Sequence, residues 1–217
     1  MTRFAHIATL FFAFFSIATA QTPQIDSLKA VIEVQPENVD AMYQLGRIYH
    51  QMGGQGDEDA VEEAQKMFES VLAIQKDNAE ALVYLGSTLT MRGRDAMMPW
   101  TKLDFVEKGC DKMDKAVLLA PNDISIRMTR GMNNINLPGF FNRLPYTIED
   151  LSYIRDFPGF PHLPQAMQQR VLYNLGVAFK RSEKFEDARA MFEKAAAIDD
   201  STDLGKQAND NLTAMNK

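Results

Sequence analysis

Residues 171–195 read VLYNLGVAFKRSEKFEDARAMFEKA, and this stretch decides the fold class. Its apolar residues recur every three or four positions on both sides of a polar turn at 181–184, which predicts two amphipathic helices joined tightly. Gly176 lies inside the first helix, where a glycine costs about 1 kcal/mol relative to alanine. We therefore expect a packing reason for this glycine, namely the close approach of a neighbouring helix.

The same arrangement recurs upstream in the chain. Leu45-Gly46, Leu85-Gly86 and Arg130-Gly131 precede Leu175-Gly176, so the glycines follow one another at 40, 45 and 45 residues. Self-similarity at this period is typical of helical repeat arrays. The sequence predicts an all-α fold, an α-solenoid of stacked antiparallel helix pairs with long loop insertions.

The last copy resembles a tetratricopeptide repeat. Its Leu-Gly pair is followed by Phe179, Ala188, Phe192 and Ala195 at the spacing of that family. The first two copies match with insertions, and the third keeps little beyond Gly131. This resemblance, over roughly residues 24–200, implies a right-handed superhelix with a concave groove and a protein-interaction role without chemistry of its own.

The first 20 residues are predicted to be a signal peptide. Arg3 gives a basic start, 7–18 is almost wholly apolar, and Ala18-Thr19-Ala20 has the small-x-small pattern of a cleavage site. The apolar run is shorter than the about 20 residues that span a bilayer. We expect an exported protein, periplasmic or secreted.

The remaining residues, 21–217, are expected to form a single helical domain. The expected parts are a half repeat at 24–36, repeats at about 39–78, 79–123, 124–164 and 169–200, and a capping helix at 201–216. Cleavage leaves 22 basic and 29 acidic residues, a net charge of −7, without a long basic cluster. This balance argues against nucleic acid as a partner and against docking on anionic lipid.

In tetratricopeptide repeat proteins the first helix of each pair lines the groove, and matching positions give the candidate contacts. These are Tyr43, Arg47, His50, Val83, Ser87, Met128, Met132, Arg170, Tyr173, Lys180 and Arg181. They combine aromatic, thioether and basic side chains, which suits a peptide with an apolar anchor and a carboxylate.

Two loops rich in proline and phenylalanine interrupt the third copy. They contain Phe140, Phe141, Arg143 and Phe160. Either these phenylalanines present a stiff apolar surface, or they fold back into the core while Asn133, Asn134 and Arg143 satisfy loop carbonyls; the second reading is favoured because exposed phenylalanines lower solubility. Trp100 is expected to anchor the insertion of the second copy.

The predicted function is a non-catalytic scaffold or adaptor that binds a peptide or protein segment in its groove. The mature chain has two histidines, His50 and His162, neither of them at metal-ligand spacing, and we expect no enzyme activity, metal or cofactor. Two alternatives stay open: a site for a small apolar or anionic ligand near the Phe140-Phe141 loop, lined by Met128, Met132, Phe141 and Phe160, and self-association into a homo-oligomer.

Overall fold

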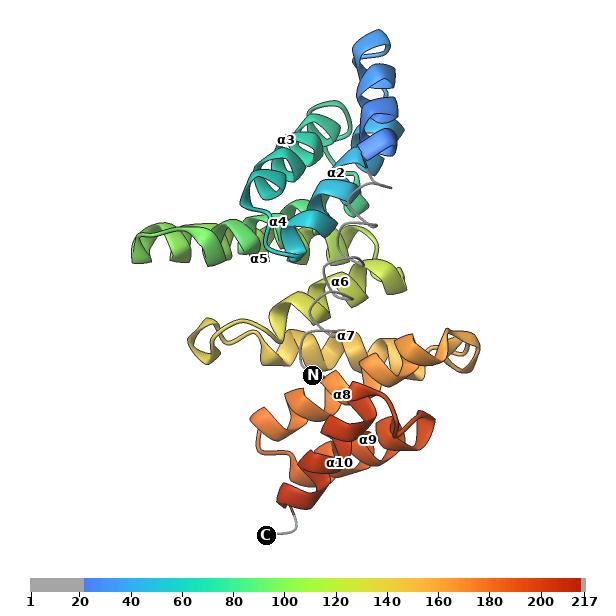
Figure 1. Cartoon of the computed structure of the whole chain (residues 1–217). Coiled ribbons are helices and arrows are strands. Elements are labelled where there is room, and N and C mark those ends of the chain that lie inside the picture. Colours follow the sequence, from blue (N-terminus) through green and yellow to red (C-terminus); the bar gives the residue numbers. More distant parts are fainter. Residues whose placement is uncertain (1–21, 216–217) are drawn as a thin grey trace, which may run out of the picture. The chain divides into compact units, whose positions relative to one another are not determined.

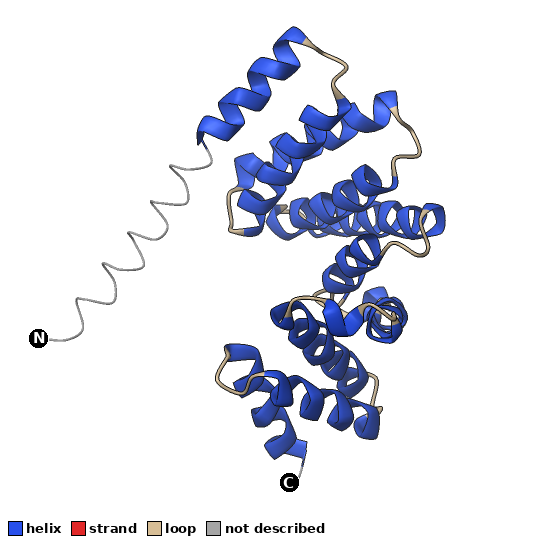
Figure 2. Ribbon diagram, turned by 90° about the vertical axis from the view of Figure 1, so that its right-hand side faces the viewer, coloured by secondary structure: helices blue, strands red, loops and turns tan. Residues whose placement is uncertain are grey.

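The computed structural model describes residues 22–215, and within this range the chain consists of helices joined by loops, without a strand (Figure 2). The predicted signal peptide, residues 1–20, lies outside the described residues. Among the helices that are described, none is long and apolar enough to cross a membrane. The all-α prediction is confirmed.

Residues 22–34 are helical, and the elements that follow include the helices α2 to α10, which are labelled in Figure 1. They are α2 (Val39–Gly54), α3 (Glu58–Ile74), α4 (Ala79–Asp95), α5 (Pro99–Leu119), α6 (Ile124–Asn134), the 3-10 turn η1 (Gly139–Phe141), α7 (Leu144–Asp156), the 3-10 turn η2 (Phe160–His162), α8 (Gln165–Arg181), α9 (Phe185–Ile198) and α10 (Asp203–Met215). Contacts divide the chain into two compact units, and the boundary falls inside α5 between Lys112 and Met113.

In the first unit, α2 packs against α3, and α4 packs against both. Their apolar stripes share one core, in which Leu45, Phe68, Val71 and Leu85 are almost fully buried. Each helix contributes residues three or four positions apart, because these lie on one face of a helix. The helix pairs that the periodicity predicts are therefore present.

In the second unit, each helix from α6 to α9 packs against the next, and α10 packs against α8 and α9. The core of this unit includes Leu151, Ile154, Leu175, Phe192 and Ala208, all of them buried. The predicted last repeat, residues 169–200, thus contributes to both helices of the α8–α9 pair.

The interior glycines are sites of close helix approach, as predicted. A Cβ atom on Gly46 would lie 2.9 Å from the ring of Phe68, and one on Gly176 would lie 2.8 Å from the ring of Phe192. In the second pair two glycines face each other: a Cβ on Gly109 would lie 2.6 Å from the carbonyl oxygen of Gly86. These separations are too short for a side-chain carbon, so the packing requires glycine.

Two turns of the first unit have the same construction, 40 residues apart. The side chain of Asn38 accepts a hydrogen bond from the amide of Ala41 and donates one to Gln35, and Asn78 does the same with Ala81 and Gln75. Asparagine is a preferred N-cap because its oxygen satisfies an amide that the first helical turn leaves unpaired. The recurrence of Gln-x-x-Asn is a signal in the sequence that marks both turns.

The insertion of the second copy is largely helical rather than a loop. The helix α4 continues to Asp95 and α5 begins at Pro99, which occupies the first turn, where proline loses no intrahelical bond. Trp100 is 68% exposed, so the expectation that it anchors this insertion is wrong. Its position in the first turn of α5 carries the indole away from the core.

Candidate functional site

Five side chains from α2 and α4 form a cluster on one face of the first unit. Tyr43, Arg47 and His50 come from α2, and Tyr84 and Ser87 come from α4. We call this cluster the α2–α4 face. Residues at intervals of three and four project from one side of a helix, which explains why 43, 47 and 50 lie together, and likewise 84 and 87.

The aromatic rings of the α2–α4 face support the guanidinium of Arg47. The guanidinium carbon lies 5.9 Å from the ring centre of Tyr43 and 5.3 Å from that of Tyr84. The two tyrosine rings meet edge to face at 6.0 Å, and Phe68 stacks on Tyr84 at 5.7 Å. Since Phe68 is fully buried, the rings are held in place from the core side.

His50 connects the two helices. Its Nε2 atom lies 2.9 Å from the hydroxyl oxygen of Ser87, and its ring meets Tyr84 edge to face at 5.1 Å. Burial, helped by the positive charge of Arg47, lowers the pKa of His50 to about 4, so the ring is neutral at neutral pH. His50 therefore acts as a neutral hydrogen-bonding group on this face.

Tyr43 is protonated on the same face. Burial raises the pKa of Tyr43, and the nearby carboxylate of Glu80 raises it further. Arg47 itself is exposed and permanently charged. The α2–α4 face thus presents a guanidinium fork on two aromatic rings, an arrangement that can bind a carboxylate and pack against the apolar groups beside it.

The sequence prediction brings Tyr43, Arg47, His50 and Ser87 to this face but selects Val83 in place of Tyr84. Val83 is only 1% exposed and cannot contact a partner, so its assignment to a binding surface is corrected. Ser87 is also buried and acts through His50. A signal for Tyr84 was available, because an aromatic three residues before Ser87 lies on the same helix face.

Several residues of the second unit that were predicted to contact a partner form hydrogen bonds within the protein instead. The hydroxyl of Tyr173 lies 2.9 Å from the side chain of Gln207, and Lys180 donates to Asn211 at 2.8 Å, so α10 covers this face of α8. Arg181 donates to the backbone carbonyls of Ile135 and Leu137.

The other residues of this unit that were predicted to contact a partner differ in their exposure to solvent. Met128 and Met132 are half-buried against the core of the second unit. Arg170 is exposed on α8. The small-ligand alternative near these methionines stays a prediction.

Of the phenylalanines in the two loops, one packs on the core and another is exposed to solvent. Phe160 is half-buried and packs on the core of the second unit, whereas Phe140 is 74% exposed and contacts Phe141 at 4.5 Å between ring centres. The expectation that Phe140 fills the core is therefore wrong. Arg181, which was not expected in this role, donates to two loop carbonyls, and Arg143 pairs with Asp114 at 2.6 Å.

A buried ion-pair network in the second unit was missed by sequence reasoning. Asp150 is fully buried and accepts hydrogen bonds from Arg127 at 2.8 Å and from Arg130 at 2.7 Å. Arg130 also contacts Asp114, which in turn holds Arg143. The network joins α5, α6, α7 and the loop before α7. Arginines three apart, at 127 and 130, mark one helix face, but nothing local indicates that it is buried.

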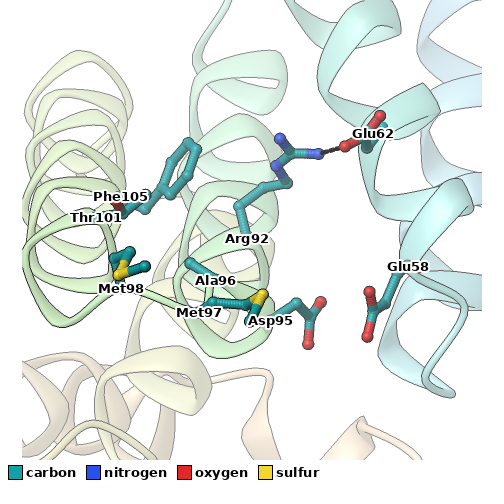
Figure 3. Close-up of a pocket in the computed structure, with 9 residues that line it drawn as sticks. All are labelled: Glu58, Glu62, Arg92, Asp95, Ala96, Met97, Met98, Thr101 and Phe105. Carbon is teal, nitrogen blue, oxygen red and sulfur yellow. Dashed lines mark hydrogen bonds and ion pairs between the residues drawn. The ribbon is translucent and has the colours of Figure 1, made fainter.

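A hollow of about 290 Å³ is lined by residues of α3, α4 and the start of α5, and Figure 3 shows these side chains. Glu58, Glu62 and Asp95 supply carboxylates, Met97, Met98 and Phe105 supply apolar surface, and Arg92 forms an ion pair with Glu62. Within residues 22–215, no group of three or more histidine, cysteine, aspartate or glutamate side chains is arranged to hold a metal ion.

Comparison with known proteins agrees with this architecture. Residues 169–202 match the tetratricopeptide repeat model. A thermophilic tetratricopeptide repeat protein from Thermus thermophilus superposes with a TM-score of 0.64 at 13% identity, over 97% of this chain and 95% of that one. No curated protein sequence matches the chain.

Two further solved structures are similar. YrrB, described as a tetratricopeptide repeat protein with an unusual peptide-binding site, gives a TM-score of 0.57 at 22% identity over 91% of this chain and 88% of that one. MamA gives 0.56 at 20% identity over 81% and 86%. At these identities the likeness shows the fold alone, a stack of helical repeats. Residues 169–202 thus carry a tetratricopeptide repeat, and the chain as a whole shares the fold of tetratricopeptide repeat proteins.

Proposed function

We propose that this protein is a non-catalytic scaffold that binds a peptide or protein segment on the α2–α4 face. The observation that carries the proposal is the exposed guanidinium of Arg47 above the rings of Tyr43 and Tyr84. Rings packed from behind by Phe68 keep this guanidinium in place before a ligand arrives. Such preorganisation lowers the entropic cost of binding.

The chemistry of the face favours a segment with a carboxylate next to an apolar side chain. Arg47 binds the carboxylate through its fork of N–H donors. The neutral His50 and the protonated Tyr43 offer further hydrogen bonds, and the tyrosine rings accept the apolar neighbour. The basic residues of α8 contribute less than the sequence predicts, because Lys180 and Arg181 already bind Asn211 and loop carbonyls.

The proposal places the protein outside the cytoplasm, in the periplasm or secreted. Export is supported by the signal-peptide pattern of residues 1–20. The net negative charge of the remaining chain argues against nucleic acid and anionic lipid as partners. The proposed activity requires no cofactor and no covalent step. Self-association through exposed apolar side chains such as Phe140 stays an alternative, which light scattering tests.

A binding experiment tests the α2–α4 face. The chain from Gln21 onward is used to select ligands from a phage-displayed heptapeptide library, and the best peptide is synthesised with a fluorescent label. Arg47→Ala is expected to weaken its binding about tenfold to a hundredfold, since a hydrogen bond to a charged group contributes about 1.5–3 kcal/mol. Replacing the peptide's carboxylate by an amide is expected to produce a similar loss.

Arg170→Ala is the matched control, because it removes the same side chain from an exposed position on α8. Unchanged binding in this variant together with the loss in Arg47→Ala supports the α2–α4 face. If both variants bind alike, the site lies elsewhere and the proposal is wrong.

A further inference from the structure

The hollow in Figure 3 is lined by residues of α4 other than those of the α2–α4 face. Tyr84 and Ser87 belong to that face, whereas the groove that continues from the hollow has Leu85 and Leu89 in its lining. One residue step turns an α-helix by about 100°, so these pairs project in different directions. A ligand in the hollow would leave Arg47 untouched.

The hollow carries more negative than positive groups. Arg92 pairs with Glu62, and Arg94 binds Asp95 at 2.5 Å, while among the described residues Glu58 forms no ion pair. Figure 3 shows the carboxylates of Glu58 and Asp95 facing each other across the opening. Since Arg94 already pairs with Asp95, the charge at this opening that has no ion pair within residues 22–215 is that of Glu58, and a positively charged side chain that enters there would pair with it.

Apolar side chains surround the same opening and point into solvent. Met97 is 90% exposed and Met98 is 48% exposed, and both line the hollow. Trp100 and Leu103 add further exposed apolar surface on the first turns of α5. Clustered apolar side chains that remain exposed in a folded protein mark interaction sites.

The hollow continues into a longer groove. Phe105 lines both the hollow and a second cavity of about 590 Å³, whose other apolar members are Leu72, Ala73, Leu85 and Leu89. The α3 wall runs from Glu58 to Ala73, about 22 Å at the ~1.5 Å rise per helical residue. This length accommodates about seven residues of an extended chain.

We infer that this groove is a docking site for an extended segment of a partner protein that carries a lysine or arginine beside apolar residues. The cationic head pairs with Glu58 at the opening, beside the Arg94–Asp95 pair, and its aliphatic stem packs on Met97 and Met98. The apolar residues that follow pass Phe105 and cover Leu72 and Ala73. Charge complementarity at the acidic end and exposed methionines select this partner chemistry. The site is separate from the α2–α4 face and does not depend on it.

The test uses a labelled octapeptide with two lysines at one end, followed by leucine, phenylalanine and serine residues, and a second peptide with glutamates in place of the lysines. Binding to the chain from Gln21 onward is measured by fluorescence anisotropy. Saturable binding of the lysine peptide is expected, and Glu58→Gln weakens it about twofold to fivefold, as for loss of an exposed charge pair. Met97→Gln, at a position too exposed to affect folding, weakens it about threefold or more.

Two matched controls separate the groove from general charge and hydrophobicity. Asp59→Asn removes a neighbouring exposed carboxylate outside the hollow, and Leu118→Gln removes an apolar side chain that is 81% exposed on the distant end of α5. Both variants are expected to bind the lysine peptide as the wild type does, and so is Arg47→Ala. A negative result for the groove is therefore distinguishable from a negative result for the α2–α4 face.

Three outcomes overturn the inference: no saturable binding of the lysine peptide, equal binding of the glutamate peptide, or equal losses in the controls. A concentration-dependent dimer in light scattering that Glu58→Gln and Met97→Gln abolish would instead identify a second copy of this chain as the occupant.

Discussion

His50 Nε2 lies 2.9 Å from Ser87 Oγ, and this contact joins α2 to α4 at the centre of the α2–α4 face. The contact belongs to a neutral imidazole, because burial and Arg47 lower the pKa of His50 to about 4. An unfolded chain would restore the usual pKa of about 6.5. The histidine therefore makes stability dependent on pH.

The sign of this dependence follows from proton binding. Between pH 6.5 and 4 the unfolded chain binds a proton at His50 that the folded chain does not, so the free energy of unfolding decreases as the pH falls through this window, by up to about 3 kcal/mol. We predict that His50→Gln, which does not titrate, loses less stability than the wild type between these pH values. Urea unfolding followed by circular dichroism at several pH values measures the difference.

His162→Gln is the matched control for this prediction, since His162 is the other histidine of the mature chain and is exposed. Identical pH profiles of the wild type and His50→Gln would show that His50 is not held neutral by the fold.

Gly109→Ala is predicted to destabilise the first unit by about 2 kcal/mol, in the range of overpacked cores. The new Cβ would lie 2.6 Å from the carbonyl oxygen of Gly86, and a backbone oxygen cannot rotate away as a side chain can. Thermal unfolding measures the change. Gly54→Ala is the control, because a Cβ there has its nearest neighbour at 3.9 Å and alanine favours the helix by up to about 1 kcal/mol.

Asp150→Asn is predicted to destabilise the second unit by about 3–5 kcal/mol, because it removes the fully buried carboxylate that pairs with the buried charges of Arg127 and Arg130 and leaves them only partly exposed acids as partners. The adjacent substitution Glu149→Gln removes a carboxylate whose side chain is 55% exposed and is expected to change stability by less than about 1 kcal/mol. Urea unfolding compares the two variants. If both variants lose the same stability, burial does not determine how much each of these two carboxylates contributes to stability, and the prediction is wrong.

Ala208→Glu is predicted to detach α10 from α8 and α9, with a loss of about 3 kcal/mol or more, because it places an unpaired carboxylate at a fully buried position. Ala214→Glu, on the same helix but exposed, is the control and is expected to unfold like the wild type. Hydrogen exchange of the α10 amides locates the change, and protection that survives in Ala208→Glu would contradict the packing of α10.

The helix pairs could be predicted from the sequence because their signals are local. Gly46 and Gly176 lie within apolar periodicity of 3.6 residues, and the partner helix must supply a ring such as Phe68 or Phe192 close to them. Periodicity identifies the buried stripe of a helix regardless of what covers it.

The candidate sites could be predicted only in part, because they depend on which helix covers which face. The resemblance to tetratricopeptide repeats selects Arg47 and His50, but it also assigns Lys180 and Tyr173 to an open surface that α10 in fact covers. Arg127 and Asp150 are 23 residues apart, and only the tertiary structure shows that they meet. Charged residues at such separations have no local signature.

The matching turns at Gln35–Asn38 and Gln75–Asn78 have a consequence for engineering the length of the array. Each turn closes itself with bonds among its own residues and the helix that it starts. A duplicated segment 39–78 would therefore begin after one such turn and end with the other, and the two turns have the same hydrogen bonds. This part of the chain is thus suited to insertion as an additional repeat in longer variants.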